Sequence, residues 1–315
     1  MKLLVTGGAG FIGSNFVQYI LEKCPDYEIT NLDALTYAGS LENLKAVVDS
    51  PRHKFFRGRI EDGKLVDELM AGIDVVINFA AESHVDRSIL DPQIFIGTNV
   101  LGTQVLLNAA LRHKVKLFYQ ISTDEVYGAL ELDSKEKFTE ESPLGPNSPY
   151  SASKAAADLL VQAYHRTYGL PVVISRCSNN YGPRQHPEKF IPTVILNALQ
   201  NKPIPIYGDG RYVRDWIHVL DHCRAIDLIM HRGKVGEVYN IGANNEWANI
   251  DLARKILQIM DKSEDLLQFV KDRPGHDRRY SLSSDKPKRE LDWKPLTPFD
   301  RGLATIVRWY SETGK

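Results

Sequence analysis

The sequence predicts an α/β fold, in which a doubly wound parallel sheet is followed by a smaller α+β C-terminal domain. Two observations lead to this prediction. Short apolar runs alternate with longer helical patterns through the first half of the chain, as in successive βαβ units. After about residue 177 the pattern changes to turn-rich segments with shorter strands. The length of 315 residues suits one large or two medium domains.

The strands of the first half are predicted from short apolar runs, and the helices between them from longer amphipathic patterns. The expected strands are Lys2–Val5, Tyr27–Asn31, Lys54–Arg57, Asp74–Phe79, Leu117–Ile121 and Pro171–Arg176. The expected helices are Phe11–Cys24, Gly63–Ala71, Pro92–Leu111 and Tyr150–Tyr168. Because helices separate the strands, we expect one parallel sheet of the Rossmann type.

The second half is expected to form a smaller domain of helices and short strands. The expected helices are Ile191–Gln200, Val219–His231, Ile250–Met260 and Asp300–Thr313, and the expected strands are Pro205–Tyr207 and Glu237–Ile241. We place the first domain at residues 1–178 and assign residues 179–315 mainly to the second. A segment at roughly 212–242 is expected to return to the first domain.

The composition excludes several classes of protein. Apolar residues make up 43% of the chain and charged residues 25%, which excludes a largely disordered or fibrous chain. Lys plus Arg number 39 against 40 Asp plus Glu, so a broad nucleic-acid-binding surface is not expected. A small basic pocket remains compatible with this balance. No segment approaches the roughly 20 apolar residues of a membrane span, so no membrane association is expected.

The cysteines indicate a reducing compartment. Cys24, Cys177 and Cys223 are odd in number, far apart and without CxxC spacing. This pattern argues against a disulfide scaffold or a zinc site and fits the cytoplasm. The histidines form no HxxxH or HExxH pair, and no metal site is expected.

A glycine-rich loop, Gly7–Gly13, follows the first expected strand and opens the first helix. Its glycines allow a tight turn and close approach of the backbone to a pyrophosphate at the helix N-terminus. The spacing is GxxGxxG, and such a turn also occurs as a plain tight turn. Asp33 strengthens the dinucleotide interpretation, because it lies 20 residues after Gly13 at the end of the second strand. A carboxylate there accepts from a ribose 2′-OH and repels a 2′-phosphate, which favours NAD over NADP. The alternative for Asp33 is a surface turn.

Tyr150 and Lys154 form a YxxxK pair at the start of an expected helix. Residues four apart share a helix face, and a lysine cation there could favour tyrosinate and hold a ribose. The pair alone is weak evidence, because Tyr19 and Lys23 have the same spacing. We interpret that second pair as a solvated helix face.

Thr123, Asp124 and Glu125 directly follow the apolar run Leu117–Ile121 and Ser122. Ligands of open α/β sheets bind at the carboxyl ends of the strands, so these side chains stand where chemistry is expected. Adjacent carboxylates can act as acid and base when their environments separate their pKa values. The alternative is a helix N-cap or a polar loop.

Together these residues resemble an extended short-chain dehydrogenase/reductase acting on a nucleotide sugar, and more narrowly the dTDP-glucose 4,6-dehydratases. The resemblance covers essentially the whole chain. The motifs that carry the narrower match are Ala80–Ser88, Thr123–Gly128, Asn179–Pro183, Pro187–Lys189, Val213–Trp216 and Gly275–Tyr280. The Thr-Asp-Glu triplet discriminates most, because sugar-nucleotide epimerases of the same fold lack the Asp-Glu pair.

The resemblance implies a role for each matching catalytic residue. Tyr150 is the base for the sugar C4 hydroxyl, Thr123 holds that hydroxyl, and Lys154 binds the nicotinamide ribose. Asp124 is the acid at the C6 hydroxyl and Glu125 the base at C5.

The resemblance also implies two sets of binding residues. The NAD site comprises Gly7, Gly10, Phe11, Ile12, Gly13, Asp33, Thr36, Ile60, Ala80, Ala81, Thr98, Tyr150, Lys154 and Asn180. The nucleotide-sugar site comprises His84, Thr123, Asn179, Glu188, Lys189, Pro205, Tyr207, Arg214, Asn249, His276 and Tyr280. A guanidinium such as that of Arg214 can bind two oxygens of a diphosphate at once.

The chain departs from the family pattern at two positions. Arg59 stands in Gly58-Arg59-Ile60 where an aspartate is usual at the adenine edge. An arginine can stack on adenine but cannot accept from its amino group. Tyr212 stands where asparagine is common beside the base, so this position does not favour thymine over uracil.

The implied activity is NAD-dependent dehydration of a nucleoside-diphosphate glucose, with dTDP-glucose the expected substrate. C4 oxidation would acidify C5–H, water would leave across C5 and C6, and hydride would return to C6. A nucleotide-sugar 4-epimerase and a UDP-sugar 4,6-dehydratase are the alternatives. Asp124 and Glu125 argue against the epimerase, which needs no acid/base pair. A non-catalytic NAD-binding sensor would be expected to lack Tyr150, Lys154 or the acidic pair. Relatives commonly dimerise, so a homodimer is expected.

Overall fold

Seven parallel strands form the larger sheet of the protein, which the computed structural model describes over residues 1–314. In spatial order they are β10 (Val238–Ile241), β6 (Val172–Cys177), β5 (Leu117–Thr123), β4 (Val75–Asn78), β1 (Lys2–Thr6), β2 (Glu28–Asp33) and β3 (His53–Arg57). The chain winds outward in both directions from the neighbouring strands β1 and β4. The predicted α/β fold class is confirmed, and this switch point is where ligands bind in such sheets.

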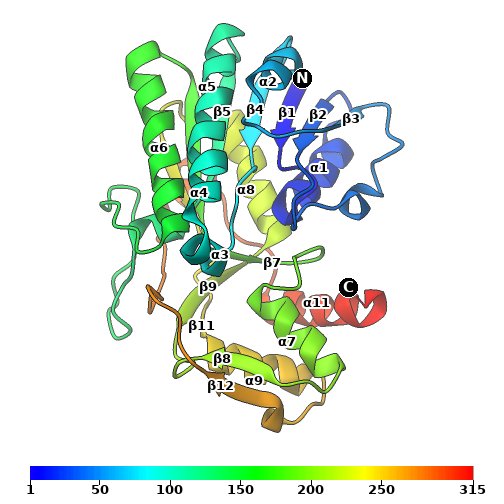
Figure 1. Ribbon diagram of the computed structural model, residues 1–315, viewed down its shortest axis with the longest axis vertical. Helices are drawn as coiled ribbons and strands as arrows, with labels where there is room; N and C mark the ends of the chain where they lie inside the picture. Colours follow the sequence, from blue (N-terminus) through cyan, green and yellow to red (C-terminus); the bar gives the residue numbers. More distant parts are fainter. Residues whose placement is uncertain (315) are drawn as a thin grey trace.

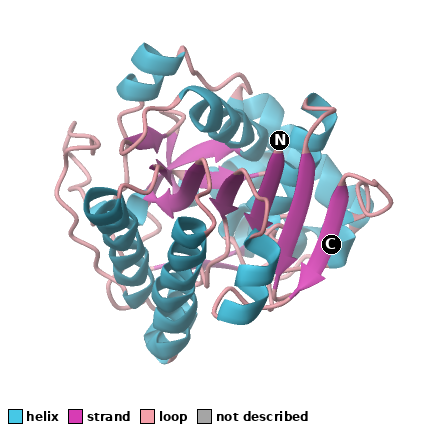
Figure 2. Ribbon diagram, turned by 90° about the horizontal axis from the view of Figure 1, so that it is seen from above, coloured by secondary structure: helices cyan, strands magenta, loops and turns pink. Residues whose placement is uncertain are grey.

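Helices cover both faces of the larger sheet, as the view from above shows (Figure 2). Helices α1 (Phe11–Lys23) and α8 (Val219–Arg232) pack on one face. Helices α2 (Gly63–Met70), α5 (Thr103–Arg112) and α6 (Pro149–Tyr168) pack on the other. Alternate strand residues therefore enter different cores, with Leu3 in the first and Leu4 in the second. Burial on both faces explains why these strands appear in the sequence as continuous apolar runs.

Local signals explain where α6 begins and ends. Ser148 forms a capping box with Ser151, and Pro149 occupies the first helical position. Gly169 ends the helix in the left-handed conformation, which glycine adopts without steric cost. The helix thus begins at Pro149, one residue before the expected start at Tyr150.

One helical run is apolar enough by length and composition to span a membrane, against our expectation that no segment would be. It comprises α4 (Pro92–Phe95), the π-helical segment Ile96–Gly102 and α5. Of its apolar 18-residue stretch, 44% is buried inside the structure. It packs against α2 and α6 in the helical layer of the sheet (Figure 1). Core helices of soluble proteins meet the same criterion, so the finding alone indicates no membrane.

The smaller domain occupies the lower part of Figure 1. A three-stranded sheet contains β7 (Asn179–Tyr181), β9 (Val213–His218) and β11 (Glu246–Ala248), and β8 (Ile204–Tyr207) pairs in parallel with β12 (Leu267–Val270). Helices α7 (Phe190–Leu199), α9 (Asn249–Ile259) and α11 (Phe299–Thr313) share one core with these strands. The remaining helices are α3 (Val85–Leu90), α10 (Asp285–Leu291) and the 3₁₀ turns Leu41–Leu44, Asp124–Tyr127 and Glu264–Leu266.

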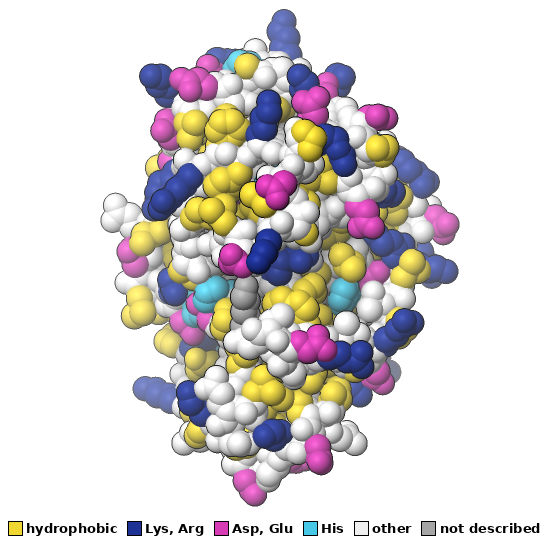
Figure 3. Space-filling view, turned by 90° about the vertical axis from the view of Figure 1, so that its right-hand side faces the viewer, with side chains coloured by type: hydrophobic (Ala, Val, Ile, Leu, Met, Phe, Trp, Pro, Cys, Tyr) yellow, Lys and Arg dark blue, Asp and Glu magenta, His cyan; other side chains and the backbone are white. Residues whose placement is uncertain are grey.

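We propose the division of the chain into residues 1–178 and, mainly, residues 179–315. The sheet topology changes only the limits of the segment that returns to the first domain. Within the segment 212–242, α8 and β10 lie with the larger sheet. Strand β9 does not, because it pairs with β7 and β11 in the smaller sheet. The segment that we propose to return therefore begins at Val219 rather than near residue 212. On the face in Figure 3, basic and acidic side chains are interspersed, as the balanced composition leads one to expect.

Candidate active site

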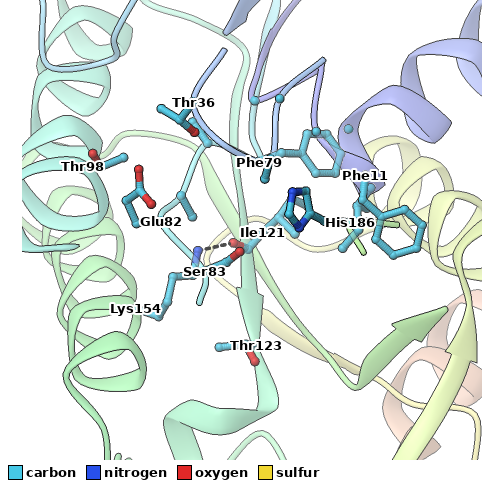
Figure 4. Close-up of a pocket in the computed structure, with 18 of the residues that line it drawn as sticks. Phe11, Thr36, Phe79, Glu82, Ser83, Thr98, Ile121, Thr123, Lys154 and His186 are labelled. Carbon is cyan, nitrogen blue, oxygen red and sulfur yellow. Dashed lines mark hydrogen bonds between the residues drawn. The ribbon is translucent and has the colours of Figure 1, made fainter. Parts of the chain in front are cut away.

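A cleft opens at the carboxyl ends of β1, β2, β4, β5 and β6, and every predicted cofactor residue lines it (Figure 4). These lining residues are Gly7, Gly10, Phe11, Ile12, Gly13, Asp33, Thr36, Ile60, Ala80, Ala81, Thr98, Tyr150, Lys154 and Asn180. The cleft extends to Thr123, Asp124 and Glu125, so one cavity joins the glycine loop to the acidic pair. Residues that we expected at the ends of different strands, such as Asp33 and Thr123, therefore line the same cleft.

Gly7 and Gly13 of the glycine loop have no room for a side chain. Gly7 adopts φ +71°, and a Cβ there would lie 2.6 Å from the Ala80 backbone nitrogen. A Cβ on Gly13 would lie 2.3 Å from the Gly7 carbonyl oxygen. Gly10 is the N-cap residue of α1, so no side chain caps this helix, and its first turn contains no acidic residue. Its free N–H groups and partial positive charge suit a diphosphate.

Asp33 is held by backbone donors where β2 ends. Its Oδ2 accepts from the Ala9 N–H at 2.9 Å and its Oδ1 from the Leu35 N–H at 2.8 Å. Burial raises the pKa of this carboxyl, and the backbone N–H groups oppose that shift. This position in the cleft fits a ribose acceptor better than the surface turn that we considered as the alternative.

Tyr150 and Lys154 lie on the same face of α6 and are both buried against the cleft. Lys154 Nζ donates to the Ile121 carbonyl oxygen at 2.7 Å, the dashed line of Figure 4. Burial raises the pKa of Tyr150 well above its usual value, and the charges of Glu125 and Asp124 add to the rise. Our expectation that Lys154 would favour tyrosinate is therefore not met in this structure, where the phenol is protonated near neutral pH.

The second YxxxK pair belongs to a different environment. Lys23 Nζ and the Tyr19 hydroxyl both donate to the carboxylate of Asp227 on α8. Neither Tyr19 nor Lys23 lines the cleft. This pair joins α1 to α8 and is structural.

The acidic pair sits in a 3₁₀ turn, Asp124–Tyr127, that starts where β5 ends. Thr123 caps the turn, because its Oγ1 accepts from the Glu125 N–H at 3.3 Å. The alternative that we considered, an N-cap, therefore also describes this segment, and the capped turn fixes the orientation of the Asp124 and Glu125 carboxyls. Burial, reinforced by the Glu125 charge, raises the pKa of Asp124 well above its usual value.

Glu125 is in a different electrostatic environment from Asp124. Burial raises its pKa too, but three cations oppose the rise, those of Arg273, Arg214 and Lys189. Asp124 is therefore the better proton donor and Glu125 the better acceptor. Two carboxyls with separated proton affinities are the arrangement that acid/base chemistry requires.

Residues of the smaller domain bring positive charge to this pair. Arg214 is buried, and its Nη1 and Nη2 donate to the carbonyls of Val213 and Asp277 at 2.8 and 2.9 Å. Its guanidinium lies 4.2 Å from the ring centre of Tyr280. Lys189 Nζ donates to the Ser83 carbonyl at 3.0 Å. Such cations beside an acid/base pair suit an anionic substrate.

The nucleotide-sugar candidates fall into two groups. Thr123, Asn179 and Lys189 line the cleft. The others lie outside its lining: His84, Glu188, Pro205, Tyr207, Arg214, Asn249, His276 and Tyr280. Three pairs among them are in contact: His84 with Glu188, Arg214 with Tyr280, and Tyr207 with His276.

Two clusters lie among these residues outside the cleft lining. His84 Nε2 lies 3.5 Å from Glu188 Oε2. His276 stacks on Tyr212 with ring centres 3.6 Å apart and meets the edge of Tyr207 at 6.1 Å. Burial and the charge of Arg273 lower the pKa of His276 to about 4, so this ring is neutral. A neutral aromatic cluster is suited to packing against a nucleobase.

Several cleft residues were not among the candidates. They include Arg59, Glu61, Glu82, Ser83, Gln185 and His186. Glu82 and Ser83 lie inside a motif, Ala80–Ser88, that carried the resemblance, so that motif was the available signal. Glu61 is placed by Thr98, whose Oγ1 donates to its Oε1 at 2.8 Å, a tertiary contact with no local signature. Within residues 1–314 no group of three or more His, Cys, Asp or Glu side chains is arranged to hold a metal ion.

Comparison with known proteins places this site in a family. The GDP-mannose 4,6 dehydratase family matches residues 4–306. The low-salt glycan biosynthesis protein Agl12 of Haloferax volcanii is 53% identical over 310 residues, 98% of each chain. The dTDP-glucose 4,6-dehydratase of Streptomyces antibioticus is 52% identical over 317 residues, 99% of this chain and 93% of the relative.

A solved structure agrees with these relatives. The crystal structure of DesIV, a dTDP-glucose 4,6-dehydratase from Streptomyces venezuelae, contains NAD. It superposes with a TM-score of 0.97 at 50% identity and covers 99% of this chain and 98% of DesIV. The chain belongs to the extended short-chain dehydrogenase/reductase family, among its NAD-dependent nucleotide-sugar epimerases and dehydratases.

Proposed function

We propose that the protein is an NAD-dependent hydro-lyase that converts dTDP-glucose to the 4-keto-6-deoxy sugar. The observation that carries this proposal is the pair of buried Asp124 and half-buried Glu125, which shares one cleft with Tyr150 and Lys154. Oxidation at C4 needs the tyrosine, and elimination across C5 and C6 needs an acid and a base. Relatives about half identical to this chain over more than 90% of their own length carry the dTDP-glucose 4,6-dehydratase name.

The residues present fit NAD. Gly7 and Gly13 have no room for a Cβ, α1 presents free N–H groups, and Asp33 stands where a 2′-phosphate would be repelled. Lys154 would hold the nicotinamide ribose, with Thr98, Ile60 and Asn180 farther along the cleft. When bound, NAD supplies a reversible hydride acceptor.

The side chains would act in sequence. Tyr150, in its ionised form, would take the proton of the C4 hydroxyl, which Thr123 would hold in place, as the C4 hydride is lost. The resulting ketone makes C5–H acidic, and Glu125 would remove that proton. Asp124, the carboxyl with the more strongly raised pKa, would protonate the departing C6 oxygen. Each positioned acid or base is typically worth about 10²–10⁴-fold.

The remaining polar groups would bind the substrate. Lys189 and Arg214 would neutralise the diphosphate, and His84, Asn179, Glu188 and Tyr280 would contact the sugar side. Pro205, Tyr207, Asn249 and His276 would line the nucleobase. In support, the charges of Lys189 and Arg214 already act on Glu125.

Product masses from a panel of dTDP-, UDP- and GDP-glucose distinguish the alternatives. The proposed dehydratase forms a product about 18 Da lighter, and the dTDP sugar should be the best substrate. A 4-epimerase gives a product of unchanged mass, and a UDP-sugar dehydratase prefers the uridine compound. Bound NAD with no turnover on any member of the panel would identify a sensor instead.

Asp33→Asn should reduce the preference for NAD over NADP by at least about tenfold, the effect of roughly 1.4 kcal/mol. The amide keeps one of the two oxygens that accept from the Ala9 and Leu35 N–H groups and removes the charge that repels a 2′-phosphate. Titration calorimetry with both cofactors measures the ratio. Asp49→Asn, at an exposed residue outside the cleft, is the control. An unchanged ratio in Asp33→Asn would remove this residue from the ribose site.

We also propose a homodimer that forms through the helical layer, and a cytoplasmic location in keeping with the free cysteines. The helical elements from α3 to α6 pack against one another and expose the apolar side chains of Leu90, Ile94, Ile96, Leu101 and Leu159. Exposed apolar side chains gathered on neighbouring elements are typical of an interaction site. A second copy would cover it by packing the same helices against each other.

Leu101→Glu should therefore convert the dimer to a 35.6 kDa monomer in light scattering after gel filtration. In the proposed dimer the introduced carboxylate would have to be buried in the interface without a partner of opposite charge. Val235→Glu is the matched control, because Val235 is similarly exposed but lies outside these helices. A dimer that persists in Leu101→Glu, or a wild-type monomer, would place the interface elsewhere or exclude it.

A further inference from the structure

A buried ion pair lies behind the catalytic residues without lining the cleft. Asp158 is one helical turn beyond Lys154 on α6, and Arg176 is on β6. Arg176 Nε donates to Asp158 Oδ2 at 2.9 Å, and the two side chains are 3% and 0% exposed. A buried ion pair gains little stability over well-packed apolar residues, since desolvation offsets the attraction. The contacts that this pair makes indicate a different role.

On one side the pair holds the end of β5 against α6. The Ser122 hydroxyl donates to Asp158 Oδ2 at 3.0 Å. The preceding residue, Ile121, accepts from Lys154 at 2.7 Å. Two consecutive residues of β5 are thereby bonded to two consecutive turns of the helix that carries Tyr150. The negative charge of Asp158 also lies near enough to Lys154 to favour its ammonium form.

On the other side the pair holds the turn that carries the acid and the base. Arg176 Nη1 donates to the Tyr127 hydroxyl at 2.9 Å, and that hydroxyl donates to Asn240 Oδ1 at 2.8 Å. Phe138 stacks on the Tyr127 ring with centres 5.0 Å apart. Tyr127 is the last residue of the 3₁₀ turn that begins at Asp124. Fixing its ring and hydroxyl fixes where the two carboxyls point.

We propose that Asp158 and Arg176 are positioning residues that set the Tyr150–Lys154 pair and the Asp124–Glu125 pair at one distance and angle from each other. Asp158 acts through Ser122 and Lys154, and Arg176 acts through Tyr127. The inference rests on the proposed function, because it assigns C4 oxidation to the first pair and elimination to the second. Misplacement of a catalytic group by about 1 Å can cost roughly 10²-fold in rate.

Tyr127→Phe tests the Arg176 arm with the smallest change. It removes the hydroxyl that joins Arg176 to Asn240 and keeps the ring against Phe138. We expect elimination to slow at least about tenfold while C4 oxidation is retained, so that reduced cofactor accumulates during turnover. Tyr239→Phe is the matched control, because its hydroxyl contacts Lys234 and Glu290 instead. A merely structural role would lower the melting temperature without changing the ratio of the two steps.

Asp158→Asn tests the other arm. The amide oxygen can still accept from Arg176 and Ser122, but the charge beside Lys154 is lost. Asp158 and Cys177 are the titratable groups that hold up the pKa of Lys154 against burial, so without Asp158 that pKa falls further. The alkaline limb of the pH profile for C4 oxidation should then move to lower pH, whereas the same limb in Tyr127→Phe should not move.

The two assays separate failure of this inference from failure of the proposed function. If the wild-type protein forms no product lighter by one water, the proposed function fails irrespective of the variants. If the wild type forms it, the inference is overturned by an unchanged ratio of oxidation to elimination in Tyr127→Phe, or by an unmoved alkaline limb in folded Asp158→Asn. Circular dichroism and retained NAD establish that each variant is folded.

Discussion

Glu125→Gln should leave C4 oxidation in place and slow elimination by about 10²–10⁴-fold, and Asp124→Asn should do the same. Both substitutions keep the size of the side chain and remove its ability to exchange a proton. Rapid mixing with dTDP-glucose should show reduced cofactor forming and persisting, because the 4-keto sugar cannot lose water. Mass spectrometry of the quenched mixture should find no product lighter by one water.

The Glu125→Gln variant carries a second expectation on pH. The charge of Glu125 raises the pKa of Tyr150, so removing that charge lowers this pKa. More of the phenol is then ionised at any given pH, and the acid limb of C4 oxidation should move to lower pH. Glu141→Gln, at an exposed residue outside the cleft, should change neither the rate nor the limb. Product formation at the wild-type rate in either acidic-pair variant would contradict its assigned role.

Tyr150→Phe should abolish the reaction at its first step, with C4 oxidation slowed by at least about 10²–10⁴-fold. The phenol hydroxyl is the group that we assign to the C4 hydroxyl proton, and phenylalanine fills the same buried space without it. NAD content after purification should be unchanged, because Asp33 and the glycine loop are untouched. No reduced cofactor should appear on mixing with substrate, in contrast to the acidic-pair variants.

Tyr164→Phe is the matched control for that experiment. Tyr164 lies on the same helix, and its hydroxyl bonds to Asn108 Oδ1 at 2.6 Å, away from the cleft. Its loss should leave oxidation at the wild-type rate. Rapid C4 oxidation by Tyr150→Phe would show that another group takes the proton.

The sequence predicts the larger sheet well because its physics is local. Continuous apolar runs indicate strands buried on both faces, and each observed strand overlaps an expected one, β10 included. The carboxyl ends of parallel strands converge by topology alone, which is why the sequence predicts that Asp33 and Thr123 lie at one edge of the sheet. Tyr150 lies on α6, and the family resemblance rather than the topology assigns it to this edge. The glycine loop was recognisable because only glycine fits its contacts with Ala80 and with itself.

The smaller domain is less predictable for the opposite reason. Strands β7 and β11 have three residues each, too few for a pattern, and β9 acquires its partners only through tertiary pairing. The expectation for Tyr150 failed similarly. A lysine one turn away is visible in the sequence, but the burial and the two carboxyls that raise the tyrosine pKa are not.

The buried supports of the site were also outside the reach of sequence patterns. Asp158 and Arg176 are 18 residues apart in the chain and meet only because α6 packs on β6. Arg214 matched a family motif, yet its donors are directed at the carbonyls of Val213 and Asp277, a geometry that no motif describes.

The most direct test of the proposed dehydration follows the hydrogen of C4. The protein should be incubated with dTDP-glucose carrying deuterium at C4, and the product analysed by mass spectrometry and NMR. The proposal predicts a product about 18 Da lighter than the labelled substrate, with the deuterium now at C6. A product of unchanged mass, or a dehydrated product without deuterium at C6, would contradict it.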